Sequence, residues 1–388
     1  MRISVSPLDS GIAHITRCYE VATELANKMC NILFLVPETK VSLVGNLKRG
    51  NTIRVDSIIS ILPEEHRDKP IFLRAIEFLV NSVRRVKEER ALYEKHGIDA
   101  VVVDLNPAAA FAAYELDLPL FIIINSHNLF FSFDLPFWNK RLKLILFPLY
   151  ILSVLILSFI KLFYNLLPAL VFRPWKIVGF YRYLNQSVKI VPEKIRKFEK
   201  LMNPNTFFVD WIKVRAYESL LFNSEQLEQR IQKRPLVYLT TGGTGFDKQQ
   251  YKKILKILTK KGYFVVGSTG GMFEVEYNPN DSLIKDFLPG SKVCEHVEFV
   301  VNHGGHGSVM QAVDKGKPVI AYPQNPGQLL FAGRLVEDRQ GVVIFSVSEL
   351  EQAIEDVKKI HIKQSQIVQD GAVKAAEIIL NNLAIYKQ

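Results

Sequence analysis

Short apolar runs alternate along the first half of the chain with longer amphipathic stretches. Between residues 15 and 29, apolar side chains recur at Ile15, Cys18, Ala22, Leu25 and Met29, which places them on one face of a helix. The apolar runs lack an alternating polar face, as in strands of a parallel sheet that is covered on both sides. This order predicts a doubly wound α/β domain. The predicted strands cover residues 2–6, 31–36, 98–105 and 118–125, and the predicted helices cover 15–29, 70–96 and 107–116.

The same alternation restarts after a polar stretch, "LMNPNTFFVDWIK". It predicts two Rossmann-like domains in tandem, residues 1–203 and 204–388, with the last helix free to pack back on the first domain. No internal repeat or low-complexity tract interrupts them. The second set of strands is expected at 235–240, 263–268, 297–302 and 317–323, with helices at 248–260, 306–315, 326–339, 348–360 and 364–383.

One segment, residues 144–172, differs from the pattern expected of a soluble protein. It is almost entirely apolar, and Lys161 is its only charged residue. It exceeds the roughly 20 apolar residues that span a bilayer. Trp138 and Trp175, each close to Lys or Arg, flank it like interface anchors. Two internal prolines, and the need for both domains in one compartment, disfavour a single span. We expect a monotopic or re-entrant helical pair that dips into one leaflet, with a buried helical hairpin as the alternative.

Composition and charge limit the classes of molecule that the protein is expected to bind. The 388 residues are 48% hydrophobic and carry a formal net charge of +10, which favours nucleotides, nucleic acid or an anionic membrane as partners. The three cysteines form no CxxC pair, so a reducing compartment without a structural metal is expected. The first residues, "MRISVSPLDSG", are typical of a strand and loop rather than a signal peptide, which predicts a cytosolic protein.

Two glycine-rich turns are candidates for binding anions. "TTGGTG" (240–245) and "HGGHGS" (303–308) each follow a predicted strand and precede a helix. Glycines let backbone N–H groups approach a phosphate, and the helix dipole adds to the attraction. Two such turns on one sheet edge are better explained by binding of a diphosphate than by packing alone. Neither a full GxGxxG with a ribose-binding acid nor a GxxxxGK[ST] occurs, which disfavours dehydrogenases and P-loop kinases.

A histidine follows the first predicted strand, in "SGIAHITR" (10–17). His14 would lie at a helix N-terminus, where the dipole disfavours the imidazolium form. A neutral imidazole that faces a cleft between the domains suits a general base. The alternative is a histidine that only caps the helix.

These motifs resemble the MurG-like branch (family 28) of GT-B glycosyltransferases. That branch includes the eukaryotic two-subunit N-acetylglucosaminyltransferase, and the chain is similar to an archaeal single-chain counterpart. The resemblance is strongest over residues 297–343 and around His14. It implies that the second domain holds a UDP-sugar and that the first presents the acceptor. The implied donor-side residues are Gly242, Gly243, Thr244, His303, Gly304, Gly305, His306, Gly307, Ser308, Gln311 and Gln328, and the acceptor-side residues are His14 as base, Gly11 and Glu115.

Three departures from the family pattern affect the predicted identity of the transferred sugar more than they affect the predicted fold. The first turn, "SGIAH", has fewer glycines than GGxGGH. Gln311 stands where the family often has a ribose-binding glutamate, and Gly327 stands where many relatives carry Asp or Gln. Gln328 matches the glutamine that reaches the donor sugar.

The expected reaction is an inverting transfer of N-acetylglucosamine from UDP-GlcNAc to a dolichyl or polyprenyl diphosphate sugar in N-glycan precursor assembly. His14 would remove the acceptor proton while UDP leaves into the glycine turns. The chain has no DxD motif, so neither a metal nor another cofactor is expected. The apolar segment and its basic flanks predict a lipid-linked acceptor and a place on the cytoplasmic face of the membrane. Nucleic acid is not an expected partner, and homo-oligomerisation stays open.

Three other functions remain open at this point. A family-28 glycolipid synthase acting on diacylglycerol shares every feature above. A UDP-sugar 2-epimerase shares the fold but needs no membrane segment. A non-catalytic subunit that binds a partner enzyme is disfavoured by His14 and the intact glycine turns.

Overall fold

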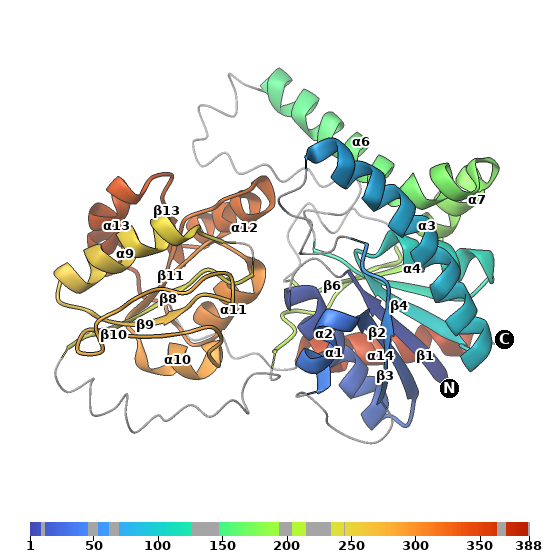
Figure 1. Ribbon diagram of the computed structural model, residues 1–388, viewed down its shortest axis with the longest axis horizontal. Coiled ribbons are helices and arrows are strands. Elements are labelled where there is room, and N and C mark those ends of the chain that lie inside the picture. The colour runs from blue at the N-terminus through green and yellow to red at the C-terminus, as the bar shows by residue number, and fades with distance from the viewer. Residues whose placement is uncertain are drawn as a thin grey trace. The chain divides into compact units, whose positions relative to one another are not determined.

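The computed structural model describes residues 1–8, 12–45, 53–61, 70–125, 147–193, 204–214, 234–243, 245–362 and 370–386. Contacts divide the chain into two compact units, each built on its own parallel sheet (Figure 1). The first unit comprises residues 1–133, 151–214 and 369–388, and the second comprises 134–150 and 215–368. The first unit therefore extends to residue 214 and not to 203, because the polar stretch expected to separate the domains contains a strand of the first sheet.

The first sheet has seven parallel strands in the order β3-β2-β1-β4-β5-β6-β7. Its central strands are the apolar runs that the sequence predicted. β3, β6 and β7 were missed because they are short or mixed in polarity, and β7 lies at the edge of the sheet, where β6 is its one partner among the described strands. The bounds are β1 Arg2–Pro7, β2 Asn31–Pro37, β3 Ile53–Ile58, β4 Ala100–Asp104, β5 Leu120–Ile123, β6 Val188–Val191 and β7 Thr206–Phe208.

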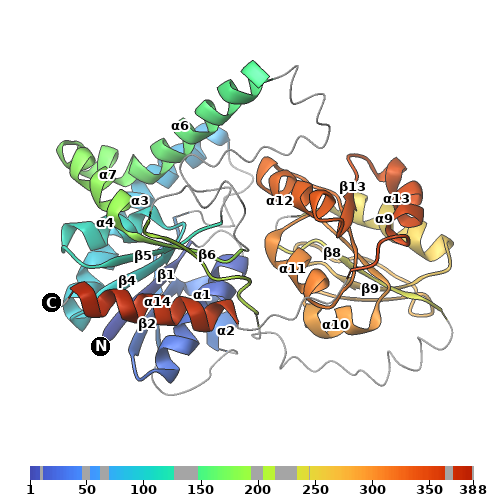
Figure 2. The same ribbon diagram turned by 180° about the vertical axis from the view of Figure 1, so that it is seen from behind.

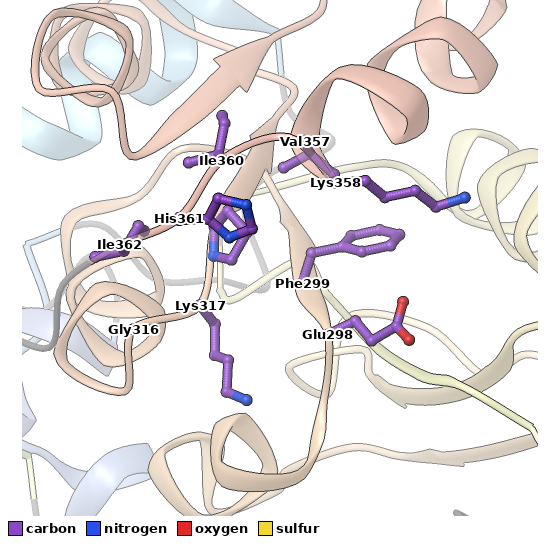
Figure 3. A pocket seen from close by; sticks show the side chains of 10 residues that line it. Glu298, Phe299, Gly316, Lys317, Val357, Lys358, Ile360, His361 and Ile362 are labelled. Atoms are coloured by element: carbon purple, nitrogen blue, oxygen red, sulfur yellow. The ribbon is translucent and has the colours of Figure 1, made fainter.

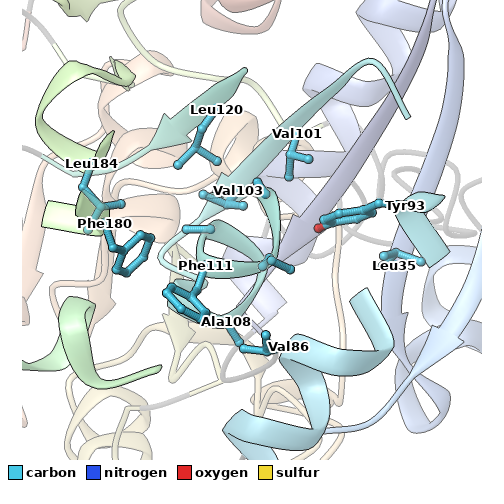
Figure 4. Close-up of a cluster of buried hydrophobic side chains, with 14 of the residues drawn as sticks. Leu35, Val86, Tyr93, Val101, Val103, Ala108, Phe111, Leu120, Phe180 and Leu184 are labelled. Carbon is cyan, nitrogen blue, oxygen red and sulfur yellow. The ribbon is translucent and has the colours of Figure 1, made fainter. Parts of the chain in front are cut away.

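Helices cover both faces of this sheet, as expected for crossover connections between parallel strands. On one face, the rings of Phe111 and Phe180 meet edge to face with centroids 4.9 Å apart, inside a cluster that also holds Val103 and Leu120 (Figure 4). The bounds are α1 Ile12–Asn27, α2 Glu38–Gly45, α3 Ile71–His96, α4 Pro107–Glu115, α6 Phe147–Phe172, η3 Pro174–Lys176, α7 Ile177–Gln186 and α14 Gly371–Tyr386.

The described part of the apolar segment, residues 147–172, forms one helix, α6, and not the helical pair that we expected. Pro148 lies in the first turn, where its missing N–H costs nothing, and Pro168 lies only four residues before the end of the helix. Leu166 and Ala169 are buried in the core of the first unit. Within the described ranges, no helix combines the length and apolarity needed to cross a bilayer.

The second sheet has six parallel strands in the order β10-β9-β8-β11-β12-β13. Apolar clusters lie on both of its faces. The strand bounds are β8 Leu236–Thr240, β9 Phe264–Ser268, β10 Ser282–Lys285, β11 Phe299–Asn302, β12 Val319–Ala321 and β13 Gly341–Val343. The helix bounds are α9 Lys248–Lys260, α10 Gly290–His296, α11 His306–Asp314, α12 Pro326–Glu337, η5 Val347–Glu349 and α13 Leu350–Val357.

The last helix returns to the first unit after the second sheet is complete. α14 packs against α1, and Figure 2 shows the two helices on the same side of the first sheet. Ala375, Ala376 and Ile379 are fully buried there. The first unit is thus made of segments from both ends of the chain.

Candidate functional site

Each sheet has one point where consecutive connections leave in opposite directions. In the first sheet this point lies between β1 and β4, and in the second it lies between β8 and β11. Ligands of open α/β sheets bind beyond the carboxyl ends of the strands at such a point. His14 and both predicted glycine turns lie at these positions in their own units.

In the first unit, the His14 Nδ1 atom lies 2.9 Å from Oδ1 of Asp104, the last residue of β4. An ionised carboxylate can only accept hydrogen bonds, so Nδ1 carries the proton in this pair. That tautomer leaves the Nε2 lone pair available as a base. The side chain of His14 is 19% exposed, whereas that of Asp104 is fully buried.

Arg17, one turn after His14 on α1, fixes the other oxygen of the same carboxylate. Its Nε and Nη2 atoms donate to Asp104 Oδ2 at 2.8 and 2.6 Å, and its Nη1 donates to Asn125 Oδ1 at 2.6 Å. Burial opposes ionisation of Asp104, but the charge of Arg17 and the hydrogen bonds from Arg17 and His14 outweigh it and keep the pKa of the carboxyl below its ordinary value. Asp104 therefore remains an anion at neutral pH.

Sequence reasoning found His14 but missed Asp104, Arg17 and Asn125. Asp104 did leave a signal, since this acid ends the apolar run "AVVV" near the carboxyl end of a predicted strand. The pairing itself depends on which strands are neighbours, and β1 and β4 are far apart in the sequence.

The two other acceptor-side candidates do not join this group. Gly11 lies outside the described residues. Glu115 lies at the C-terminal end of α4, whose N-terminus is at the carboxyl edge of the sheet, so Glu115 is at the opposite edge from His14. Its buried carboxylate binds Lys176 Nζ at 2.6 Å and Arg173 Nε at 3.1 Å. Glu115 holds η3 against α4, and the structure does not bring it together with His14.

In the second unit, the side chain of His303, the first residue of the second glycine turn, lies between the two turns. A Cβ atom at Gly242 would be 2.7 Å from its Cε1, and one at Gly305 would be 2.2 Å from its Nε2. Gly242 and Gly304 also have positive φ angles of 55° and 77°, a backbone conformation that favours glycine. The glycines therefore let the turns close around the imidazole.

His303 has a structural role within this pair of turns. It is 6% exposed, and burial lowers its pKa to about 4, against a smaller opposing effect of the Thr240 carbonyl. A neutral, buried imidazole offers no charge to a phosphate. His306, the first residue of α11, instead places its ring edge-on to Phe331 with centroids 4.8 Å apart.

The start of α11 is the candidate anion site of the second turn. No side chain caps the helix after Gly305, and a Cβ at Gly307 would meet no atom within 4 Å. The turn before it is fixed by the Gly304 N–H, which donates to Asn302 Oδ1 at 2.8 Å. Ser308 Oγ donates to the Gly305 carbonyl at 3.1 Å. Uncapped N–H groups beside open space suit a phosphate.

A third glycine turn, which sequence reasoning missed, supports the first. Gly270 and Gly271 follow β9 with φ angles of 64° and 72°. A Cβ at Gly270 would lie 1.9 Å from the Gly242 carbonyl oxygen, so only glycine fits. The Gly270 N–H donates to the Asp286 carbonyl at 2.8 Å. The double glycine in "STGGM" was the available signal.

The remaining donor-side candidates differ in position. The Gln311 carboxamide contacts the backbone at Gly290, the first residue of α10, where a Cβ would be 2.3 Å from Oε1. Gln328 is 7% exposed, and its Oε1 accepts from the Gln324 N–H at 2.8 Å, so this oxygen shapes the loop before α12. Thr244 lies outside the described residues, whereas Gly243 is partly exposed in the first turn.

The second unit contains a cavity of about 340 Å³ (Figure 3). Its walls include Glu298 and Phe299 at the start of β11, and Lys317 before β12. These are the amino ends of the strands, so the cavity is at the opposite edge from the glycine turns. Among the described residues, no group of His, Cys, Asp and Glu side chains is suited to hold a metal ion.

The chain is similar in sequence to several glycosyltransferases. NDP-glycosyltransferase YjiC from Bacillus subtilis is 30% identical over 149 residues, 36% of each chain. A PGL/p-HBAD biosynthesis glycosyltransferase from Mycobacterium tuberculosis is 30% identical over 111 residues, 29% of this chain and 26% of that protein. A sterol 3-beta-glucosyltransferase from Vanderwaltozyma polyspora is 26% identical over 212 residues, 46% of this chain and 17% of that protein. The chain thus spans about a third or less of the length of these curated relatives. No protein-family model matches it.

Solved structures share the fold over nearly the whole chain. The glycotransferase of kitacinnamycin has a TM-score of 0.72 at 15% identity, covering 98% of this chain and 99% of that one. UDP-glucose:anthocyanidin 3-O-glucosyltransferase, solved in complex with UDP, has a TM-score of 0.67 at 16% identity, covering 97% and 94%. The predicted pair of Rossmann-like domains is confirmed, and the fold is that of GT-B glycosyltransferases. Membership of the MurG-like branch and an archaeal origin stay predictions.

Proposed function

We propose that this protein is an inverting glycosyltransferase that uses a UDP-sugar. The observation that carries the proposal is the His14–Asp104 pair at the switch point of the first sheet. Glycine turns that suit a diphosphate, at the switch point of the second sheet, support it. So do the glycosyltransferase relatives and the neighbour solved with UDP.

In the proposed reaction, the acceptor hydroxyl attacks the anomeric carbon of the donor as the bond from that carbon to the UDP oxygen breaks. His14 Nε2 takes the hydroxyl proton, and the Asp104 carboxylate stabilises the imidazolium that forms. The N–H groups at the start of α11 stabilise the negative charge that develops on the leaving phosphate. No step in this scheme passes through a metal ion.

The finer proposal is transfer of N-acetylglucosamine from UDP-GlcNAc to a lipid-linked diphosphate sugar at the cytoplasmic membrane surface. The apolar helix α6 belongs to the unit that carries His14, which favours a lipid acceptor. The net charge of +10 suits an anionic lipid or diphosphate. A sterol glucosyltransferase among the relatives, whose name gives a lipid acceptor, is consistent with this choice.

The test is a transfer assay with the purified full chain. Radiolabelled UDP-GlcNAc, UDP-glucose and UDP-galactose are each offered with a polyprenyl diphosphate sugar, a sterol or diacylglycerol, and the products are separated by chromatography. Labelled polyprenyl diphosphate sugar from UDP-GlcNAc, absent with His14→Ala, is the expected result. Transfer to diacylglycerol or sterol instead would replace the finer proposal with a glycolipid synthase. Epimerised UDP-sugar without transfer, or no turnover of any donor, would contradict a glycosyltransferase.

A further inference from the structure

Among the α6 side chains that the structure describes, all those that are exposed are apolar. We call them the α6 face: Ile156, Phe159, Ile160, Phe163 and Val171, which are between 42% and 69% exposed. Their spacing places them on one side of the helix, while Leu166 and Ala169, outside this arc, are buried in the core. A helix on the surface of a soluble protein normally carries polar residues on its outward side.

Cations gather at the C-terminal end of this face. Lys87 Nζ on α3 lies 5.9 Å from the centroid of the Phe172 ring, and the Arg173 guanidinium lies 5.3 Å from it. Arg173 and Lys176 share the single carboxylate of Glu115, which is 2% exposed and so presents little charge to the surface. The end of the α6 face therefore carries more positive than negative charge.

The chain continues from these cations into two more exposed apolar side chains. Trp175 is 75% exposed and Val178 is 66% exposed. Arg182 follows Val178 by one turn of α7 and is also exposed. An apolar helix face with a Trp and several Arg or Lys residues at one end is the pattern of a helix that lies in a membrane interface.

We infer that the α6 face docks on an anionic lipid bilayer, with α6 lying along the surface and Lys87, Arg173, Lys176 and Arg182 at the level of the headgroups. The charge of this end complements anionic lipid, and Arg or Lys stems can lie over apolar surface while their charges reach water. This inference deepens the proposed function, on which it rests for a lipid acceptor. It adds the surface that would bring the first unit to that acceptor.

The test measures binding of the purified full chain to vesicles by sedimentation, without donor or acceptor. Binding to phosphatidylglycerol/phosphatidylcholine vesicles should exceed binding to pure phosphatidylcholine and should weaken as salt rises. The double variant Phe159→Ser/Phe163→Ser should bind more than tenfold more weakly. Ile385→Ser is the matched control, because Ile385 is 70% exposed on α14 and outside the α6 face. Circular dichroism melting confirms that each variant is folded.

The double variant Lys87→Gln/Arg182→Gln tests the charged end. Its affinity for anionic vesicles should fall about fivefold for each cation removed, and its affinity for neutral vesicles should change little. The inference is overturned if the wild-type chain stays in the supernatant, or if the double Phe variant binds as well as the Ile385 control. It is also overturned if light scattering shows a dimer that this variant dissociates, since a second copy would then occupy the face.

Activity on a short-chain, water-soluble acceptor separates this inference from the proposed function. The double Phe variant should retain that activity while losing transfer to a long-chain acceptor in vesicles. Vesicle binding without any transfer would refute the function alone, and transfer without vesicle binding would refute the docking face alone.

Discussion

Asp104 determines which nitrogen of His14 is free. The carboxylate is buried, charged, and bound on both oxygens, so it fixes the position and the tautomer of the imidazole. From the sequence we expected the helix dipole to keep His14 neutral. The structure instead pairs His14 with an anion, which stabilises the imidazolium after proton transfer.

We predict that Asp104→Asn and His14→Gln each lower turnover about 100-fold or more with a smaller effect on donor KM, because each removes proton transfer and leaves the glycine turns intact. Steady-state transfer assays measure both parameters. Asp99→Asn is the matched control, since Asp99 lies at the amino end of the same strand, where it accepts the Arg2 N–H at 2.8 Å. Full turnover by His14→Gln would remove the proposed base. Melting must show that the Asp104 variant still folds, because the buried Arg17 loses its charged partner in it.

His303 makes the second unit sensitive to acid. Its folded pKa of about 4 lies below that of an exposed histidine, so between about pH 6.5 and 4 the unfolded chain binds a proton that the folded chain does not. The contribution of His303 to the unfolding free energy is therefore fully present above pH 6.5. It is lost as the pH falls towards 4, which lowers the unfolding free energy by at most about 3 kcal/mol.

Urea unfolding at pH 7.5 and 4.5 measures this difference. In His303→Gln the loss of stability between the two pH values should be about 2–3 kcal/mol smaller than in the wild type, because glutamine does not titrate. His361→Gln, at an exposed histidine of the same unit, is the control. An equal loss in the wild type and His303→Gln would place the pH dependence elsewhere.

At the scale of elements, most of the candidate site residues lie in the turns that join a strand to the next helix. The sequence predicted the turns at Gly242 and at Gly305, and it placed α3 and α9 within one residue of their observed ends. Hydrophobic period and glycine position determine those features locally. The packing of the turns around His303 involves residues from two separate strands, so no local pattern reports it.

Gly242→Ala should weaken UDP binding more than tenfold, because its Cβ would collide with His303 at 2.7 Å and displace one turn from the other. Gly262→Ala is the matched control. Gly262 also has a positive φ, of 88°, but a Cβ there meets no atom within 4 Å. Both variants carry the strain of about 1–2 kcal/mol for a left-handed residue, and only the first should lose affinity. Titration calorimetry with UDP compares them, and equal affinities would mean that the turn does not hold the nucleotide.

At the scale of the whole molecule, the chain does not divide at a single boundary. The polar stretch after α7 contains β7, and the last helix belongs to the unit where the chain began. Gly371 begins α14 by donating its N–H to the Trp211 carbonyl at 3.1 Å. The first unit is therefore incomplete without the C-terminal residues.

We predict that Ile379→Ala lowers the unfolding free energy of the first unit by about 2–4 kcal/mol, because it leaves a cavity between α14 and α1. Ile385→Ala, in the same helix but 70% exposed, should cost less than about 1 kcal/mol. Urea unfolding followed by tryptophan fluorescence compares the two. Equal effects would show that α14 contributes nothing to this unit.

The sequence by itself determined the two parallel α/β units, the glycine turns and His14, because period, apolarity and turn chemistry act between residues that are close in the chain. Tertiary structure alone decided three features. It brought Asp104 and Arg17 to His14, placed Glu115 at the far edge, and gave α6 one buried and one exposed apolar side. Each depends on which strands and helices become neighbours, and residues about 90 positions apart cannot signal that through a local pattern.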